Sequence, residues 1–292
     1  MLDQVSFKLY DSFTGAYDAL ASGAVDGLAA RDWSERPPLF QLTLNQTGLI
    51  LHNGIEPTLG VIIFNWVSDD TRFFREQRVR QALDVGLDTS SVVDRAMSNM
   101  AFRANSPMIL GSWAYAPDVS PPEYNQDSAR QLLQQAVDRL DRLNGTDDTE
   151  TEPTPEGSFE VSASLFTFTI LTPDEPALVN LTNEIATQWS QLNINVSVET
   201  VDRETYETRL RAHDFDAALV EYSLGESADP DVYAFWHQGQ YPDGANYGGA
   251  DDRRISELLE RARREPYGIN RMRDYASFQR LFVERAIAIP LY

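Results

Sequence analysis

The seven-residue run Gly60–Trp66 (GVIIFNW) is the feature that most restricts the fold of this chain. A nearly continuous apolar run of this length is typical of a strand that is buried on both faces of its sheet. Such a strand needs a covering layer on each side, and helices supply these layers in α/β proteins. Helical patterns over Arg75–Leu87 and Ser90–Asn99 follow directly, so an α/β fold is predicted.

The rest of the chain continues this alternation of strands and helices. Apolar spacing of three and four residues predicts further helices over Phe13–Ser22, Asp127–Leu143, Pro176–Gln191, Arg203–Ala212, Asp252–Arg264 and Asn270–Glu284. Alternating or apolar runs predict strands at Val5–Tyr10, Val25–Leu28, Gln41–Asn45, Gly48–His52, Phe159–Ile170, Ile194–Glu199, Asp216–Glu221 and Ile287–Tyr292. Residues 102–125, rich in proline and aromatics, are expected to form a long ordered loop, and residues 145–157 an acidic surface loop.

Composition excludes several classes of function. With 24 basic and 45 acidic side chains the formal charge is −21, so nucleic acid and anionic membranes are unfavourable partners. No apolar run approaches the roughly 18 residues that a membrane-spanning helix needs, so no membrane insertion is expected. The chain has no cysteine, which removes disulfides, zinc–thiolate sites and thiol nucleophiles. No cofactor and no metal are expected.

Catalytic motifs are absent from the sequence. The three histidines lie in no HExxH arrangement, and there is no GxSxG, Walker or GxGxxG motif. Among 45 carboxylates, acidic pairs arise by chance, and Asp229-Pro230-Asp231 lacks the spacing of a calcium loop. The chain is therefore predicted not to be an enzyme. Two alternatives stay open: a hydrolase that uses Glu226 with Asp229 or Asp251, and an interaction module whose acidic face binds a basic partner.

From Gly60 onward the chain resembles a known family. Phe64-Asn65, Phe73-Phe74, Arg78–Leu83 (RVRQAL) and Leu87-Asp88 match the order of one of its conserved segments. Other elements in family order are Tyr17–Asp26 (YDALASGAVD), Pro121–Leu133, Trp189–Val196 (WSQLNINV), Phe215-Asp216, Glu226–Pro230 (ESADP), Asn246-Tyr247 and Arg273–Tyr292. Together they resemble family 5 extracellular solute-binding proteins, the oligopeptide- and dipeptide-binding receptors of ABC transporters.

The resemblance implies a domain organisation. The chain is expected to be a C-terminal fragment with a type II periplasmic-binding-protein-like fold. Residues 1–58 would be a remnant of lobe I, residues 59–286 would form lobe III, and residues 287–292 would be a return strand toward lobe I. The implied function is the substrate-binding component of an ABC importer. A monomeric, extracytoplasmic receptor would bind a peptide or similar polar solute between its lobes and deliver it to the permease subunits. The fragment alone is expected not to bind.

The resemblance also implies ligand-binding residues. By position, Glu226 matches the acidic residue that pairs with the α-ammonium of a bound peptide, although relatives usually carry aspartate there and this chain has one additional residue before it. Tyr222 and Trp236 flank this loop and, with Tyr247, are candidates for a cleft wall. Arg211 lies where some relatives place an arginine that faces the ligand carboxylate. Further candidates for the wall are Trp113, Tyr115 and Tyr233, and Arg209 is a second candidate for the arginine.

Other polar residues in these segments are assigned structural roles. Asp229 precedes a proline and is expected to cap a short helix over Asp231–His237. Arg80 lies one helical turn before Asp84 and is expected to pair with Asp84 or Glu76. These contacts would hold the fold rather than a ligand.

Overall fold

The computed structural model describes residues 4–29, 50, 52, 56–144, 165–223 and 229–292. They divide into two compact units, Met1–Glu56 and Pro57–Tyr292. In the first unit, helix α1 (Phe13–Ala21) begins where Ser12 Oγ accepts a hydrogen bond from Gly15 N at 3.2 Å. This confirms the predicted helix. The predicted acidic loop 145–157, most of the strands at 41–45 and 48–52, and Glu226 lie outside the described residues.

Two predicted strands of the first unit are wrong. Val5–Tyr10 and Val25–Leu28 form no strand, and Phe7 and Leu9 are 90% and 98% exposed. The alternation of apolar and polar residues is present in Val5–Tyr10. Within the described part of this unit, however, there is no strand against which it could pair, and an unpaired strand buries neither its backbone groups nor one face.

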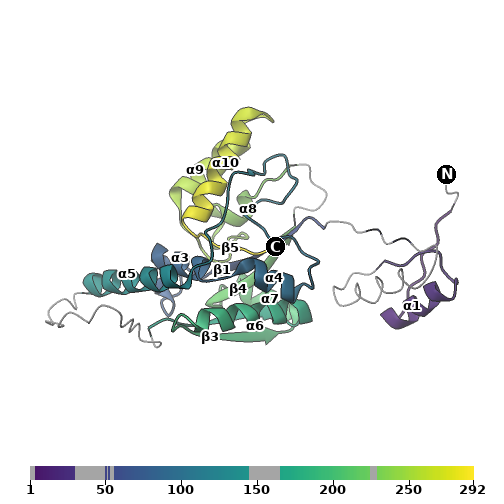
Figure 1. The fold of residues 1–292 in the computed structure, drawn as a ribbon. Coiled ribbons are helices and arrows are strands. Elements are labelled where there is room, and N and C mark those ends of the chain that lie inside the picture. Colours follow the sequence, from purple (N-terminus) through teal and green to yellow (C-terminus); the bar gives the residue numbers. More distant parts are fainter. Residues whose placement is uncertain (1–3, 30–49, 51, 53–55, 145–164, 224–228) are drawn as a thin grey trace. The chain divides into compact units, whose positions relative to one another are not determined.

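The second unit contains a five-stranded mixed sheet in the order β3-β2-β4-β1-β5 (Figure 1). Strand β2 runs parallel to β3 and β4, whereas β1 runs antiparallel to β4 and β5. The strands are β1 (Thr58–Phe64), β2 (Thr167–Pro173), β3 (Asn195–Val201), β4 (Ala217–Ser223) and β5 (Ile289–Pro290). All residues of β1 after Thr58 are buried, which confirms that the apolar run is covered on both faces.

Helices cover both faces of the sheet, and the bounds of most match the sequence prediction within two residues. They are α3 (Gln77–Val85), α4 (Thr89–Ala96), α5 (Gln126–Asn144), α6 (Pro176–Ser190), α7 (Arg203–Arg211), α8 (Tyr233–Trp236), α9 (Arg253–Arg264) and α10 (Ile269–Glu284), with short 3₁₀ turns η2 (Arg72–Arg75) and η3 (Gln238–Gln240). Helices α9 and α10 pack side by side, and α6 packs against β2 and β3 (Figure 1).

The two faces of β1 enter different parts of the core. Leu59, Val61 and Ile63 pack in the cluster that includes Phe278 and Phe282 of α10. Phe64 lies on the other face, with its ring 4.7 Å from that of Phe74 and 6.5 Å from that of Trp189. Strand β1 therefore joins the two helical layers, which is the arrangement that its apolar run predicts.

The long loop at residues 102–125 is ordered by one buried amide. Gln279 of α10 accepts hydrogen bonds from Ser106 Oγ at 2.8 Å and Ala116 N at 3.1 Å, and donates to Ala114 O at 2.8 Å. A buried amide with these three partners fixes the path of a loop that has no regular structure of its own. The prediction of an ordered loop is confirmed.

Residues 287–292, predicted as a return strand toward lobe I, pair inside the second unit. Gly60 N donates to Tyr292 O at 2.9 Å and Leu291 N donates to Gly60 O at 2.8 Å. The predicted strand Ile287–Tyr292 is reduced to β5, which pairs with β1. Assignment of these units to lobes stays a prediction.

Candidate functional site

A cavity of about 260 Å³ lies at the carboxyl ends of the parallel strands β2 and β4. The carboxyl edge of parallel strands is where open α/β sheets place their ligands. Its wall is formed by Pro173, Leu178, Arg203, Tyr206, Glu207, Leu210, Arg211, Leu219, Val220, Glu221 and Tyr247. Two of the sequence-predicted ligand residues, Arg211 and Tyr247, therefore line one cavity.

The arginines of this wall each pair with a carboxylate. Arg211 Nη2 lies 2.9 Å from Glu207 Oε2, one turn earlier on α7. Arg203 forms an ion pair with Glu175, which precedes α6. All four side chains are substantially exposed, so each pair adds only about 0–1 kcal/mol to stability. Arg209 turns to Glu199 and Asp214 instead, at 2.8 and 3.2 Å, and is not part of the cavity wall.

Glu221 of β4 lines the cavity, and a tyrosine orients its carboxylate. The hydroxyl of Tyr292 donates to Glu221 Oε1 at 2.7 Å. Burial raises the pKa of Tyr292 well above its usual value, and the negative charge of Glu221 raises it further. The pKa of Tyr206 is raised as well, first by burial and then by charges that include Glu221. Both tyrosines are therefore neutral donors at physiological pH.

Gly60 makes this orientation possible. It faces Glu221 across the β1–β4 pair, and the ring of Tyr292 lies over it. A Cβ atom at position 60 would be 2.3 Å from a ring carbon of Tyr292, which is closer than carbon atoms approach each other. The missing side chain of Gly60 thus provides the space that Tyr292 fills when it reaches Glu221.

Replacement of Gly60 by alanine is expected to lower the free energy of unfolding by about 1–3 kcal/mol, because the new methyl group must displace the Tyr292 ring. Urea denaturation of Gly60→Ala, Tyr292→Ala and the double variant measures this as a double-mutant cycle. In the Tyr292→Ala background the same change at Gly60 should cost little. An equal cost in both backgrounds would show that another contact carries the effect.

Tyr247 is held at the cavity wall through its backbone. His213 Nδ1 lies 2.7 Å from Tyr247 O, and the neighbouring Gly248 O accepts from Trp66 N at 2.8 Å. Asn246 is buried and binds His237 O at 3.3 Å and both backbone groups of Ala250 at 3.0 Å. The backbone on both sides of the Tyr247 side chain is therefore fixed.

Tyr222 and Trp236, also predicted as wall residues, lie in the core. They are only 6% and 5% exposed, and the Tyr222 hydroxyl donates to Pro107 O at 3.0 Å. With Tyr247 they line a second cavity of about 20 Å³, which is large enough for about one water molecule. Tyr222 stacks on Phe235 at 4.4 Å, and Trp236 packs edge-on against Phe282 at 4.6 Å. Tyr247 lines the larger cavity, whereas Tyr222 and Trp236 do not.

Asp229 has a different partner from the one predicted. Its carboxylate binds Arg271 Nη2 of α10 at 2.7 and 2.9 Å. Helix α8 has no side-chain cap at its N-cap residue Val232, and the residue before it, Asp231, accepts from Tyr233 N through Oδ1 at 3.0 Å. Prediction of a structural role for Asp229 is correct, but the stabilising contact is an ion pair that joins two distant segments.

The remaining aromatic candidates are engaged with other side chains. The ring of Trp113 lies 4.8 Å from that of Tyr267, Tyr233 stacks on His237 at 4.1 Å, and Tyr115 accepts from Asn105 Nδ2 at 3.4 Å. None of them lines the larger cavity.

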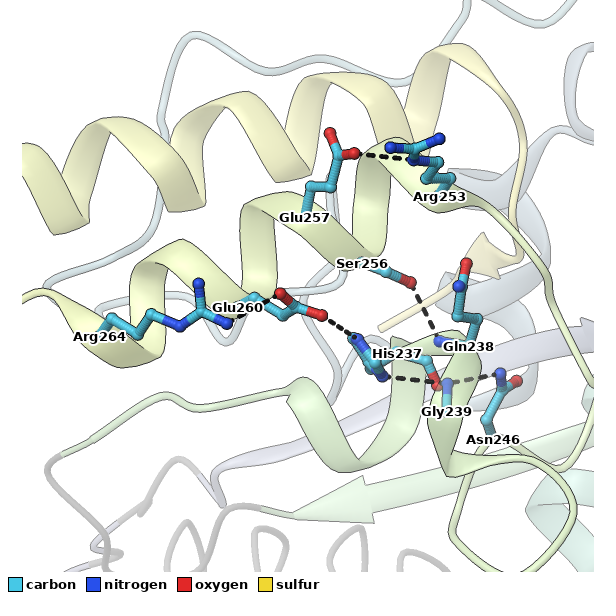
Figure 2. A network of polar contacts seen from close by, with 9 residues as sticks. All are labelled: His237, Gln238, Gly239, Asn246, Arg253, Ser256, Glu257, Glu260 and Arg264. Carbon is cyan, nitrogen blue, oxygen red and sulfur yellow. Dashed lines mark hydrogen bonds and ion pairs between the residues drawn. The ribbon is translucent and has the colours of Figure 1, made fainter.

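His237 lies in a polar network that joins the Tyr233–Ala250 segment to α9 (Figure 2). Its Nδ1 accepts from Gly239 N at 3.0 Å, so Nε2 carries the proton and donates to Glu260 Oε1 at 3.1 Å. Glu260 also pairs with Arg264 at 3.1 Å. Both ring nitrogens are occupied by structural contacts, so the imidazole is not available as a general base.

Ser256, drawn in the same network, is not a nucleophile of His237. Its Oγ accepts from Gln238 N at 3.1 Å (Figure 2). The contact attaches the start of η3 to α9, and an activated nucleophile would instead hydrogen-bond to a base. Among the described residues no cluster of three or more metal-ligating side chains is present, and no helix is long and apolar enough to cross a membrane.

Sequence reasoning missed Glu221, which lines the cavity, and Tyr292, whose hydroxyl donates to it. One signal was available: Glu221 interrupts the apolar strand AALVEYS of β4, where a charged side chain must have a specific environment. That environment depends on Tyr292, which is 71 residues away in sequence, and no local pattern reveals such a contact.

The carboxyl ends of parallel strands, where this cavity lies, are the place at which open α/β sheets bind ligands. The chain belongs to the bacterial extracellular solute-binding proteins, family 5, whose family model matches residues 1–244. This confirms the resemblance, the α/β fold of periplasmic-binding-protein type and the assignment to a family of binding proteins rather than enzymes. The matches offer no support for the alternative of a hydrolase.

Individual relatives agree with this assignment. The oligopeptide-binding protein AppA of Bacillus subtilis is 25% identical over 90% of this chain and 45% of its own length. Di/tripeptide-binding protein 1 of Pseudomonas aeruginosa is 23% identical over 80% of this chain and 39% of its own. The solved structure of B. subtilis AppA in complex with a nonapeptide superposes with a TM-score of 0.73 at 20% identity, covering 96% of this chain and 52% of that one. The chain thus spans about half the length of these relatives.

Proposed function

We propose that this chain is part of the substrate-binding component of an ABC importer, which binds a peptide or a similar small polar solute. The observation that carries the proposal is the cavity of about 260 Å³ at the carboxyl ends of β2 and β4, lined by charged and aromatic side chains. Family membership and the peptide-binding names of the relatives support a peptide as the solute.

In this proposal residues 1–58 belong to lobe I, residues 59–286 form lobe III, and residues 287–292 lead back toward lobe I. The solute is enclosed when the lobes close around it, and no covalent step takes place. The complete receptor acts as a monomer outside the cytoplasm and delivers the solute to the permease subunits. Arg211 and Tyr247 contact the solute from the cavity wall, and Tyr222 and Trp236 support that wall from the core.

Isothermal calorimetry and mass spectrometry of the natural full-length protein test this function. We expect small peptides to co-purify with it, to bind with measurable heat and to be recovered unchanged. Residues 1–292 alone serve as the control and should not bind peptides measurably, because pockets that bind well enclose about 70–90% of the ligand surface. Cleavage of the peptide, or absence of any bound solute, would refute the proposal.

For Glu226, we expect replacement by alanine in the full-length protein to weaken peptide binding at least about tenfold. A carboxylate that pairs with a desolvated ammonium makes a charge-assisted hydrogen bond, which contributes about 1.5–3 kcal/mol. Glu204→Ala, an exposed change on α7, is the matched control and should leave affinity unchanged. Equal affinities of the Glu226→Ala and Glu204→Ala variants would remove Glu226 from the site.

A further inference from the structure

We propose that His213 is a positioning residue of the candidate site. In its doubly protonated form it holds the segment Tyr241–Tyr247 against the end of α7, and the loss of one proton loosens this segment and weakens solute binding. The side chain of Tyr247, at the end of the segment, lines the larger cavity. The effect on solute binding rests on the proposed function, whereas the contacts of the imidazole do not.

Both ring nitrogens of His213 face main-chain carbonyl groups. Nδ1 lies 2.7 Å from Tyr247 O, and Nε2 lies 3.1 Å from Pro242 O. A carbonyl oxygen only accepts hydrogen bonds, and a neutral imidazole carries one N–H, so the neutral ring makes only one of these two hydrogen bonds. The imidazolium carries two N–H groups and makes both. The contacts of this ring therefore match its charged form.

The backbone of His213 gives the ring a fixed starting point. The residue follows Ala212, the C-cap of α7, and its φ of 56° lies in the left-handed region that favours glycine. His213 N donates to Leu210 O at 3.1 Å, and Asn65 Nδ2 donates to His213 O at 2.9 Å. A side chain costs stability at such a position, and the two contacts of the imidazole offset this cost.

The charged groups on the elements around His213 are mostly negative. They are Arg209 of α7, Glu199 of β3, Asp70 after β1, and Asp214, Asp216 and Asp243 in connecting segments. Arg209 is balanced by Glu199 and Asp214, at 2.8 and 3.2 Å. The other carboxylates give this region a negative sum, so a positive charge on the ring is not repelled. The ring of Tyr241, with its centre 4.6 Å from that of the imidazole, also attracts a cation.

Loss of one proton is expected to release Pro242. The contact with Tyr247 O is shorter and less exposed, so the neutral ring should keep its proton on Nδ1 for this carbonyl. The lone pair of Nε2 then faces the lone pairs of Pro242 O, which repel it. The segment that leads to Tyr247 loses an anchor, and the Tyr247 side chain is held less firmly at the cavity. Histidine ordinarily changes its charge between pH 5 and 8, so the strength of this anchor follows the pH of the surroundings.

His237, which is buried nearby in sequence, responds to acid in the opposite sense. Its Nδ1 accepts from Gly239 N, so its contacts need the neutral ring. Acid therefore breaks a contact of His237, whereas it completes the contacts of His213. The sign of the pH dependence of binding thus tells which of the two histidines controls the site.

The experiment uses the natural full-length protein, the variant His213→Gln and the control His52→Gln. His52 is exposed and lies in the first unit, so it is a histidine without a role in the cavity wall. Calorimetry measures the affinity of each protein for tri-alanine between pH 5 and pH 8. Ionisation of the peptide affects all three proteins equally, so the ratio of the wild-type affinity to that of His213→Gln isolates the ring.

We expect this ratio to fall by about threefold to tenfold from pH 5 to pH 8, the change that corresponds to the loss of one hydrogen bond. His52→Gln should follow the wild type at every pH, and equal melting temperatures of the three proteins verify the fold. A ratio that stays constant, or that rises with pH, overturns the positioning role of His213 but leaves the proposed function in place.

Two further readouts are independent of peptide binding. Nuclear magnetic resonance of isotope-labelled histidine distinguishes the doubly protonated ring from each neutral tautomer, and His213→Gln identifies the signal of His213. We expect two ring protons at pH 5 and a single one, on Nδ1, at pH 8. Crystals of the wild type should keep both carbonyl oxygens within hydrogen-bond distance of the ring at pH 5 and only Tyr247 O at pH 8.

These readouts separate the two proposals. If no peptide binds at any pH but the ring and Pro242 respond as expected, the proposed function fails and the pH-dependent contact of His213 stands. A ring that is neutral at pH 5, or one that loses a proton while both carbonyl contacts stay unchanged, overturns the contact and with it the positioning role.

Discussion

Replacement of Arg80 by methionine is expected to lower the free energy of unfolding of this chain by about 3–5 kcal/mol. Arg80 Nε donates to Ala286 O at 2.8 Å, Nη2 donates to Arg285 O at 3.1 Å, and Nη1 donates to Phe74 O. The side chain is buried, and its guanidinium lies 3.8 Å from the centre of the Trp66 ring. Methionine fills a similar volume but leaves these carbonyl groups without their donor.

Urea denaturation followed by circular dichroism measures this loss. Arg95→Met is the matched control, because Arg95 on α4 is half exposed and pairs with the exposed Glu184 at 2.8 Å. Such a pair contributes about 0–1 kcal/mol, so the control should be nearly neutral. A loss below 1 kcal/mol for Arg80→Met would contradict the view that Arg80 joins α3 to the end of α10.

Replacement of Asp84 by asparagine is expected to raise the free energy of unfolding above that of the wild type at pH 8. This gain should be up to about 4 kcal/mol larger at pH 8 than at pH 4. Burial raises the pKa of Asp84 from 3.8 to about 7, and the positive charge of Arg103 offsets only part of this. Between these values the folded protein keeps the proton that the unfolded chain loses. Stability due to this group is therefore complete below pH 4 and is lost as pH rises toward 7, at 1.36 kcal/mol per pKa unit.

The measurement is the difference in unfolding free energy between Asp84→Asn and the wild type, at pH values from 4 to 8. The difference should grow with pH up to about pH 7 and then level off. Asp94→Asn, an exposed change on α4, is the control and should stay within about 0.5 kcal/mol of the wild type at every pH. A difference that does not change with pH would place the ionisation of Asp84 outside the folding equilibrium.

Most helices and strands of the second unit were predicted from the sequence, because the signals that define them lie within short segments. Helix α9 begins after Asp252, whose Oδ1 accepts from Ile255 N at 3.0 Å, and the apolar spacing of its sequence fixes the buried face. A pattern of this kind is complete within one or two helical turns, so it is readable without the fold. Strand β1 was equally clear, because its apolar residues require cover on both sides.

The contacts of charged residues were predicted less well. Arg80 was expected to pair with Asp84 or Glu76, but its guanidinium donates to main-chain carbonyls, two of which lie more than 200 residues away. Neither ion pair is present among the described residues, and Glu76 pairs with Arg78 and Arg139 at 3.0 and 3.2 Å. Spacing along a helix shows which side chains of that helix can contact one another. The hydrogen-bond acceptors of a buried side chain often belong to other elements, which the spacing does not reveal.

In the candidate site, too, contacts between distant segments were harder to predict than local patterns. Family motifs in the sequence drew attention to Tyr222 and Tyr247, and the structure separates them: the Tyr222 hydroxyl binds Pro107 O in the core, and Tyr247 lines the cavity. Arg211 also lines the cavity, and its contact with a ligand carboxylate stays a prediction, whereas Glu221 was not anticipated.

The α/β class, the helices and the doubly buried strand β1 could be predicted from patterns that short segments carry, and the family from the order of such segments along the chain. Three features could not be predicted in this way: Val5–Tyr10 is not a strand, Arg80 joins α3 to the chain that follows α10, and Glu221 lines a cavity. Each of these outcomes depends on a partner that is distant in sequence. The packing of the sheet against its helices fixes where such a partner lies, and hence what a buried or charged side chain can contact.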